Sequence, residues 1–163
     1  MKNALLLGLS VLALSACGKA DGELKPGNWK MDATVVDFQI PGLPVAMKQS
    51  ASGMIGKTDT SFRCIQDAEA KTGVRSLAGS FQQGDCQMSD YQASGGKLSG
   101  NLKCKMDDKG GSMDMKMTGT YSEDRLEVEM AGTILEKSMP QGKAEMRLKM
   151  IAAHTGDCAG KPA

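Results

Sequence analysis

Apolar and polar residues alternate with a period of two along much of the second half of the chain, from Cys86 to Ile151. The alternation is clearest at residues 113–118, where three methionines alternate with Asp114, Lys116 and Thr118. A period of two is typical of β-strands that bury one face and expose the other. The four turns between successive predicted strands can all be placed so that the apolar residues share one continuous face. This half of the chain therefore predicts an antiparallel meander.

The requirement that apolar residues share one face also predicts how these strands pair. A three-residue hairpin loop at residues 94–96 would place Cys86 opposite Cys104, and a slip by one residue would turn apolar groups to water. The expected opposed pairs are Cys86–Cys104, Met88–Leu102, Gln92–Leu98, Cys104–Met113, Leu102–Met115, Met117–Met130, Gly119–Val128 and Tyr121–Leu126. The last strand is expected to direct Ala144, Met146, Leu148 and Met150 inward.

The first half of the domain predicts further strands. Residues 29–35 alternate, and the alternation then continues with the opposite parity to residue 40. This change of parity predicts a β-bulge near Val35-Val36. Segments 47–56 and 60–64 have weaker strand patterns, which glycines interrupt in the first of them.

One segment has a helical pattern. Val74, Leu77, Ala78 and Phe81 fall on one face of a helix expected over residues 72–82, with Thr72 as its N-terminal cap. Antiparallel sheets of this size tend to curl, and the apolar face of the helix has a suitable size to cover the concave side. The expected fold is mainly β, a curled, half-barrel or barrel-like antiparallel meander of about seven to eight strands with one short covering helix.

The first 16 residues have the features of a signal peptide. Lys2 precedes an apolar run of about 11 residues, whereas a helix that spans a bilayer needs roughly 20. Leu14-Ser15-Ala16-Cys17 resembles the lipobox of bacterial lipoproteins, which implies cleavage before Cys17 and a diacylglycerol on its sulfur. In that pattern Gly18 stands where an Asp would retain the protein at the inner membrane, so the resemblance implies an outer-membrane lipoprotein that faces the periplasm.

The expected organisation is a signal peptide at residues 1–16, a lipidated tether at 17–25 and a single β-rich domain at 26–163. Loss of Lys2 with the leader leaves 19 of the 20 basic residues against 19 acidic residues. A chain without net charge and without a basic run has little attraction for nucleic acid. We therefore expect the membrane to be a partner through the N-terminal lipid, and nucleic acid not to be one.

Four cysteines remain after lipidation, and an oxidising compartment favours two disulfide bonds. The predicted hairpin register selects Cys86–Cys104, because opposed residues of paired strands lie within disulfide reach. Cys64–Cys158 then follows by elimination. A zinc site is the alternative, but the cysteine spacing lacks the close Cys-x-x-Cys pairs of such sites, so no metal is expected there.

Short motifs along the domain occur in an order that resembles one family of proteins. The motifs are Pro26-Gly27-Asn28-Trp29, Pro41-Gly42-Leu43-Pro44, Cys64, Gly84-Asp85-Cys86, Lys103-Cys104 and Gly156-Asp157-Cys158. The family consists of small exported proteins of Gram-negative bacteria and is known only as a domain of unknown function. The resemblance implies an exported β-rich domain with paired cysteines, and it carries over no catalytic or ligand residues.

The methionines supply the main candidate site. The predicted inner face carries Met113, Met115, Met117, Met130, Met146 and Met150. Thioether sulfur suits Cu(I), but the methionines of a buried core would alternate in the same way. A curled sheet lined with methionine is also suited to a small apolar ligand, because methionine side chains re-pack to fit varied shapes.

No sequence pattern indicates an enzyme. The chain has one histidine, His154, and it lacks a nucleophile elbow, a phosphate loop and a His-Glu-x-x-His motif. We expect a non-enzymatic, lipid-anchored envelope module without a cofactor, which binds a small apolar ligand in its curled sheet. The alternatives are a structural module with a filled core that contacts other envelope proteins, and a Cu(I)-binding protein.

Overall fold

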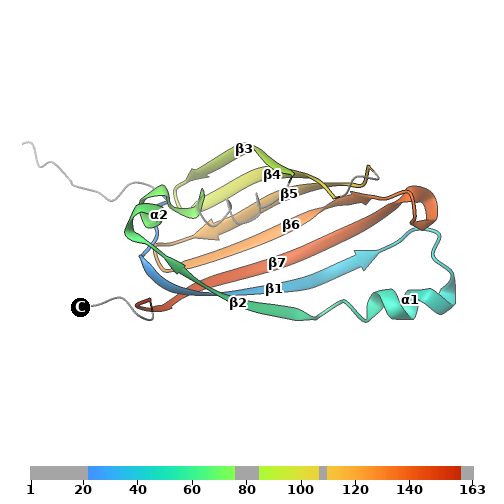
Figure 1. The fold of residues 1–163 in the computed structure, drawn as a ribbon, viewed down its shortest axis with the longest axis horizontal. Helices are drawn as coiled ribbons and strands as arrows, with labels where there is room; N and C mark the ends of the chain where they lie inside the picture. The colour runs from blue at the N-terminus through green and yellow to red at the C-terminus, as the bar shows by residue number, and fades with distance from the viewer. Residues whose placement is uncertain (1–21, 76–84, 107–109, 159–163) are drawn as a thin grey trace, which may run out of the picture.

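The computed structural model describes residues 22–75, 85–106 and 110–158. These residues form one antiparallel sheet in the order β2-β1-β7-β6-β5-β4-β3 (Figure 1). The strands are β1 (Gly27–Gln39), β2 (Thr58–Ile65), β3 (Cys86–Ser94), β4 (Lys97–Lys105), β5 (Ser112–Tyr121), β6 (Arg125–Leu135) and β7 (Lys143–Gly156). The expected mainly β class and the antiparallel meander are confirmed. The sheet is open, with β2 and β3 at its edges, and does not close into a barrel.

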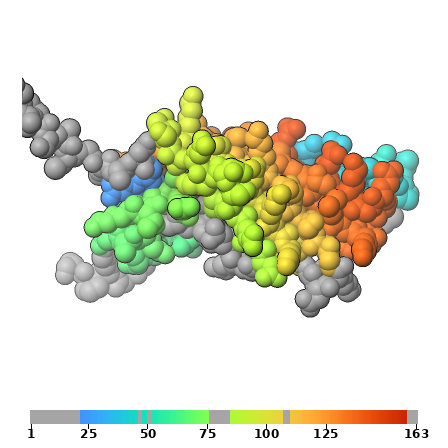
Figure 2. Space-filling model, turned by 90° about the horizontal axis from the view of Figure 1, so that it is seen from above, coloured from blue at the N-terminus to red at the C-terminus, as the bar shows by residue number. Residues whose placement is uncertain are grey.

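Short helical elements lie at the two ends of the sheet (Figure 1). α1 (Val45–Ser52) follows β1 at one end, and α2 (Asp67–Thr72) follows β2 at the other. A 3-10 turn, η2 (Pro140–Gly142), joins β6 to β7 at the same end as α1. Seen from above, α2 and the start of β7 also lie at opposite ends of the molecule (Figure 2).

The predicted strand pairings are confirmed, with one exception. Cys86 lies opposite Cys104, Met115 opposite Leu102, and Met117 opposite Met130. The predicted bulge in β1 is also present, because the register with β7 shifts between Val35 and Asp37. Burying one face fixes the register of each pair, since a slip by one residue would reverse every side chain.

The exception is the hairpin between β3 and β4. Gly95 and Gly96 both have positive φ, +58° and +75°, and form a two-residue turn in place of the predicted three-residue loop. Leu98 therefore faces Ala93 and not Gln92. Two consecutive glycines adopt these angles without steric cost and match the twist of the strands. A bulge between Ser89 and Gln92 absorbs the extra residue, which keeps Met88 in its predicted pair.

The strand predicted at residues 47–56 is wrong, because α1 occupies most of that segment. The amide of Lys48 donates to the carbonyl of Pro44 over 3.2 Å, which is the first bond of the helix. The segment is rich in Ala, Met, Lys and Gln, residues with good helix propensity. The other weak strand, predicted at residues 60–64, is present as part of β2.

The helix expected over residues 72–82 differs at its start. Thr72 ends α2, and its hydroxyl donates to the carbonyl of Glu69 over 2.7 Å instead of capping a new helix. Gly73 follows with φ +67°, and residues 74–75 are helical again. The remainder, including Leu77, Ala78 and Phe81, lies outside the described residues.

The core lies on the inner face of the sheet. It includes residues that lie nearer the N-terminus than the sequence predicted. Trp29 is completely buried, and its indole Nε1 donates to the carbonyl of Lys25 over 2.9 Å. Leu24, which was expected in the tether, is also buried, and its amide donates to the carbonyl of Ala70 over 3.0 Å. The amide of Val74 donates to the carbonyl of Gly22 over 3.0 Å. The chain is therefore bonded to the domain from Gly22 onward.

Candidate functional site

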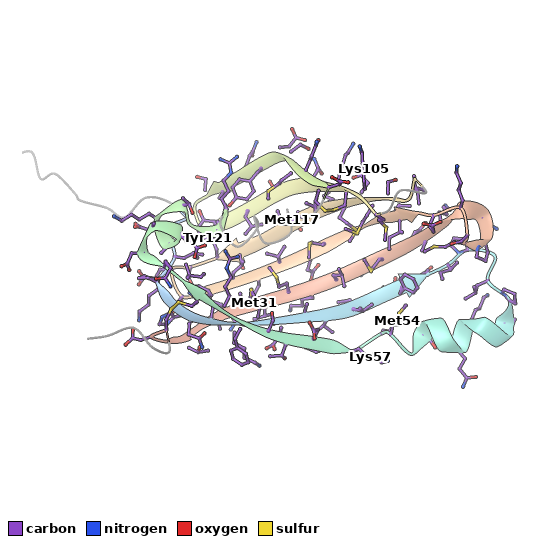
Figure 3. The ribbon with its side chains drawn as sticks, viewed as in Figure 1. Met31, Met54, Lys57, Lys105, Met117 and Tyr121 are labelled. Carbon is purple, nitrogen blue, oxygen red and sulfur yellow. A yellow bond between two sulfur atoms is a disulfide. The ribbon has the colours of Figure 1, made fainter. Side chains whose placement is uncertain are left out.

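The centre of the predicted ligand-binding face is a filled core. Met115, Met117, Met130 and Met150 are at most 5 % exposed, and Met117 lies on the inner side of the sheet (Figure 3). The cavity lined by Val74, Tyr91, Leu98, Met117, Leu126, Val128 and Met150 has a volume of only about 10 Å³. That volume is roughly the space of one water molecule, so the described side chains fill this part of the inner face.

Two of the six predicted methionines are less deeply buried. Met113 and Met146 pack against the core but remain partly accessible. Met146 lies opposite Phe38, which the bulge in β1 has brought onto the inner face. Met113, which lies opposite Ile134, and Met146 are both toward the α1 end of the sheet.

A cavity of about 460 Å³ opens at that end, and we call it the α1 groove. The end of β1, the following turn and α1 form its walls. Its apolar lining residues are Phe38, Ile40, Pro41, Leu43 and Ile55, and its polar lining residues are Asp37, Gln39, Lys48 and Ser52. Its volume falls within the range of small-molecule sites, about 300–1,000 Å³.

Backbone hydrogen bonds fix the shape of the α1 groove. The turn after β1 closes with the amide of Leu43 donating to the carbonyl of Ile40 over 3.3 Å, and Gly42 adopts φ +77°. Beyond α1, the amide of Gly56 donates to the carbonyl of Val35 over 2.8 Å, which returns the chain to β1. A side chain at Gly42 would press on Gln141 of the β6–β7 turn. The groove thus depends on three segments that are separate in sequence.

Two opposite charges lie among the apolar lining residues. Asp37 accepts a hydrogen bond from the side-chain amide of Gln39 over 3.0 Å. Lys48 projects from α1, where it is the only charged residue of the helix. An apolar pocket with a few polar groups at its margin can hold the hydrocarbon part of a ligand and orient its polar end.

The predicted cysteine pairs are both formed. Cys86 and Cys104 bridge β3 and β4 with a Cα–Cα distance of 3.9 Å. Cys64 of β2 and Cys158 after β7 are bonded with a Cα–Cα distance of 5.4 Å. The predicted lipidation residue, Cys17, lies outside the described residues.

The described residues contain no group of three or more His, Cys, Asp or Glu side chains that could hold a metal ion. Cu(I) binding by thioethers stays a prediction, and an anaerobic Cu(I) titration tests it. The burial of Met115 and Met117 favours core packing, because Cu(I) would have to reach sulfur atoms that solvent barely touches.

The exposed carboxylates of the sheet have the character of solvated charges. The pKa of Glu127 is lowered mainly by the hydrogen bonds from Arg125, and the pKa of Asp32 is lowered by hydrogen bonds from Lys30 and Thr60. A general acid would need the opposite shift in an enclosed site. Both pKa values are therefore shifted in the direction opposite to the one a general acid needs.

His154 has a structural position that sequence alone did not reveal. Its ring meets the ring of Trp29 edge-on, with 6.0 Å between centroids, and its Nε2 lies 3.0 Å from the carbonyl oxygen of Pro26. Register with β1 was the only signal that could have placed it there. His154 lies opposite Trp29 near the start of β1, whereas the α1 groove lies at the other end of that strand.

Tyr91 has a buried hydroxyl without a hydrogen-bond partner among the described residues. Burial raises the pKa of this phenol, and Tyr121 adds to the rise, while the guanidinium of Arg75, 5.6 Å from the ring centroid, opposes it. Tyr91→Phe is expected to leave the free energy of unfolding unchanged or to raise it by up to about 1 kcal/mol, because an unsatisfied polar group is removed. Urea denaturation measures the change, and a loss above about 1 kcal/mol would mean that the hydroxyl is bonded.

A family model matches most of the chain. The model of a protein of unknown function, DUF3617, matches residues 24–158. Neither the curated proteins nor the solved structures include a significant match. Among the described residues, no helix is long and apolar enough to cross a membrane.

Proposed function

Because this chain belongs to the DUF3617 family of proteins of unknown function, we propose a function from its own geometry: it is an exported, lipid-anchored module that binds one small apolar ligand in the α1 groove. The observation that carries the proposal is the contrast between the middle of the inner face and the α1 groove beside the end of β1. The middle leaves about 10 Å³, whereas the α1 groove leaves about 460 Å³. Only the second volume is compatible with a drug-sized or lipid-like molecule.

The lipid anchor rests on the leader and on Cys17. Cys17→Ser is expected to move the protein from the membrane fraction to the soluble periplasmic fraction, because the acyl attachment point is lost. Cell fractionation with immunoblotting measures the shift, and Ser10→Ala, in the leader but outside the lipobox-like residues, is the matched control. Unchanged membrane association of the Cys17 variant would refute the anchor without bearing on the groove.

Ligand binding can be tested with a fatty acid that carries an environment-sensitive fluorophore. Ser52→Trp is expected to weaken binding of this probe by about tenfold or more, because the indole would fill space in the α1 groove. Gln49→Trp is the matched control, since Gln49 is exposed on the same helix but does not line the groove. If the native protein shows no saturable binding, or both variants lose affinity equally, the ligand proposal fails.

A second candidate function is a protein-interaction module with a filled core. It is favoured by exposed apolar side chains near the α1 groove, where Val45 is 82 % exposed and Ile55 42 %. A groove of this kind can also receive a side chain of another envelope protein. If the native protein binds the fatty-acid probe saturably and Ser52→Trp abolishes that binding, the ligand function is favoured. If the native protein shows no saturable binding of the probe, the interaction module is favoured.

A further inference from the structure

β2 is an edge strand whose outer side pairs with no other strand in the described part of the chain. The residues from Thr58 to Phe62 are exposed, and Phe62 is 65 % exposed. Such an edge offers a row of backbone donors and acceptors to another strand. β2 contains no proline, which would have blocked pairing at this edge.

The backbone groups that point to the free edge belong to the even-numbered residues. The amide of Val35 donates to the carbonyl of Lys57 over 3.2 Å, so this pair is bonded toward β1. In antiparallel pairs the bonded positions alternate, so Asp59, Ser61 and Arg63 also direct their backbone groups toward β1. Thr58, Thr60 and Phe62 direct theirs outward.

We propose that two copies of this protein associate by antiparallel pairing of their β2 strands, with Ser61 of one copy opposite Ser61 of the other. This register gives a closed two-fold interface. It pairs outward-facing Thr60 with outward-facing Phe62, so the backbone hydrogen bonds of both copies are satisfied. It also places Asp59 of each copy opposite Arg63 of the other.

Charge selects this register over the neighbouring ones. A register centred on Asp59 or on Arg63 would oppose like charges directly, and one centred on Thr60 would place Lys57 against Arg63. A register centred on Phe62 would place Arg63 against Ser61 and Asp59 against Ile65, so neither charge would face an opposite one. Among the registers centred within residues 59–63, which pair most of β2, only the one centred on Ser61 joins opposite charges twice. Directly opposed opposite charges stabilise antiparallel pairs.

The same register also gives the exposed Phe62 side chain an apolar neighbour, the Phe62 ring of the other copy. The two Phe62 rings become diagonal neighbours on the outer face, a distance that aromatic side chains can bridge. Within its own copy Arg63 bonds Glu69 over 3.1 Å, and in the dimer its guanidinium would also lie opposite the carboxylate of Asp59.

Cross-linking tests the register directly. Opposed residues at a non-hydrogen-bonded position have Cα atoms about 4.5 Å apart, which is within disulfide reach. With diamide added as oxidant, the two thiols of Ser61→Cys should each lose a proton and an electron and form an interchain disulfide. Non-reducing electrophoresis of the full chain in mild detergent should then show a dimer. Ser89→Cys, at an exposed serine on the opposite edge strand β3, and the native chain are the controls. Both should run as monomers on this gel, because neither forms a disulfide between two β2 strands.

Charge variants supply an independent test. Light scattering of the full chain in mild detergent should show a dimer that dissociates on dilution. Asp59→Lys should weaken the dimer about tenfold or more, because it opposes Arg63 of the other copy, while Asp85→Lys, which is exposed away from β2, should not. A native chain that stays monomeric up to millimolar concentration, or a Ser61→Cys dimer no more abundant than that of Ser89→Cys, would overturn the proposal.

Discussion

Trp29→Ala is expected to lower the free energy of unfolding by about 3–5 kcal/mol. Trp29 is completely buried at the first inward position of β1, where it contacts the edge of His154 and bonds the carbonyl of Lys25. Alanine would leave a cavity beneath the α2 end of the sheet and an unsatisfied carbonyl beside it. Since small domains are stable by only about 5–15 kcal/mol, this loss would bring the protein close to unfolding at ordinary temperature.

Urea denaturation followed by far-ultraviolet circular dichroism measures this effect, because the variant lacks its only tryptophan. Trp29→Phe is the matched control. It keeps much of the apolar volume and loses the indole donor to Lys25, so a smaller cost of about 1–3 kcal/mol is expected. If Trp29→Ala costs no more than Trp29→Phe, the buried volume of the Trp29 side chain does not stabilise the core.

The paired strands from β3 to β7 could be predicted from sequence because each has one buried face. Met117 can meet Met130, and Tyr121 can meet Leu126, only in the register that keeps all four on the same side. The two predicted disulfides depend on the same reasoning, since the pairing of Cys86 with Cys104 left one partner for Cys64. Local alternation was therefore sufficient wherever neighbouring strands are joined by short turns.

The α1 groove could not be predicted, because its walls come together only in the folded chain. The bulge after Val35 was visible as a change of parity, but nothing local showed that it would turn Phe38 toward Met146. The segment that forms α1 has no periodic apolar face, and two glycines nearby resembled strand interruptions. Long-range contacts at the end of the sheet outweighed these weak local signals.

The same limit applies to the face predicted to bind a ligand. Alternating methionines established that one face is apolar, and this was correct for Met115, Met117, Met130 and Met150. Alternation does not distinguish a face that is packed from one that is hollow, because both are lined by the same residue types. The volume left between side chains made that distinction, and it moved the candidate site toward Phe38 and Lys48.

Replacing both Cys64 and Cys158 by alanine is expected to lower the free energy of unfolding by about 4–5 kcal/mol, because the bond closes a loop with a sequence separation of 94 residues. The matched control is the double alanine variant of Cys86 and Cys104, whose separation of 18 residues predicts a smaller loss of about 3 kcal/mol. Both losses can be measured by urea denaturation under oxidising conditions.

The Cys64–Cys158 bond also has a local consequence that loop length does not capture. It joins the edge strand β2 to the segment after β7 across β1, since Asn28 of β1 lies between Cys64 and Gly156. Hydrogen exchange at β2 is therefore expected to accelerate more than exchange at β5 when this bond is removed, because opening of an edge becomes a local event. Equal losses of stability in the two double variants, with uniform acceleration of exchange, would show that this bond does not specifically hold β2 to the sheet.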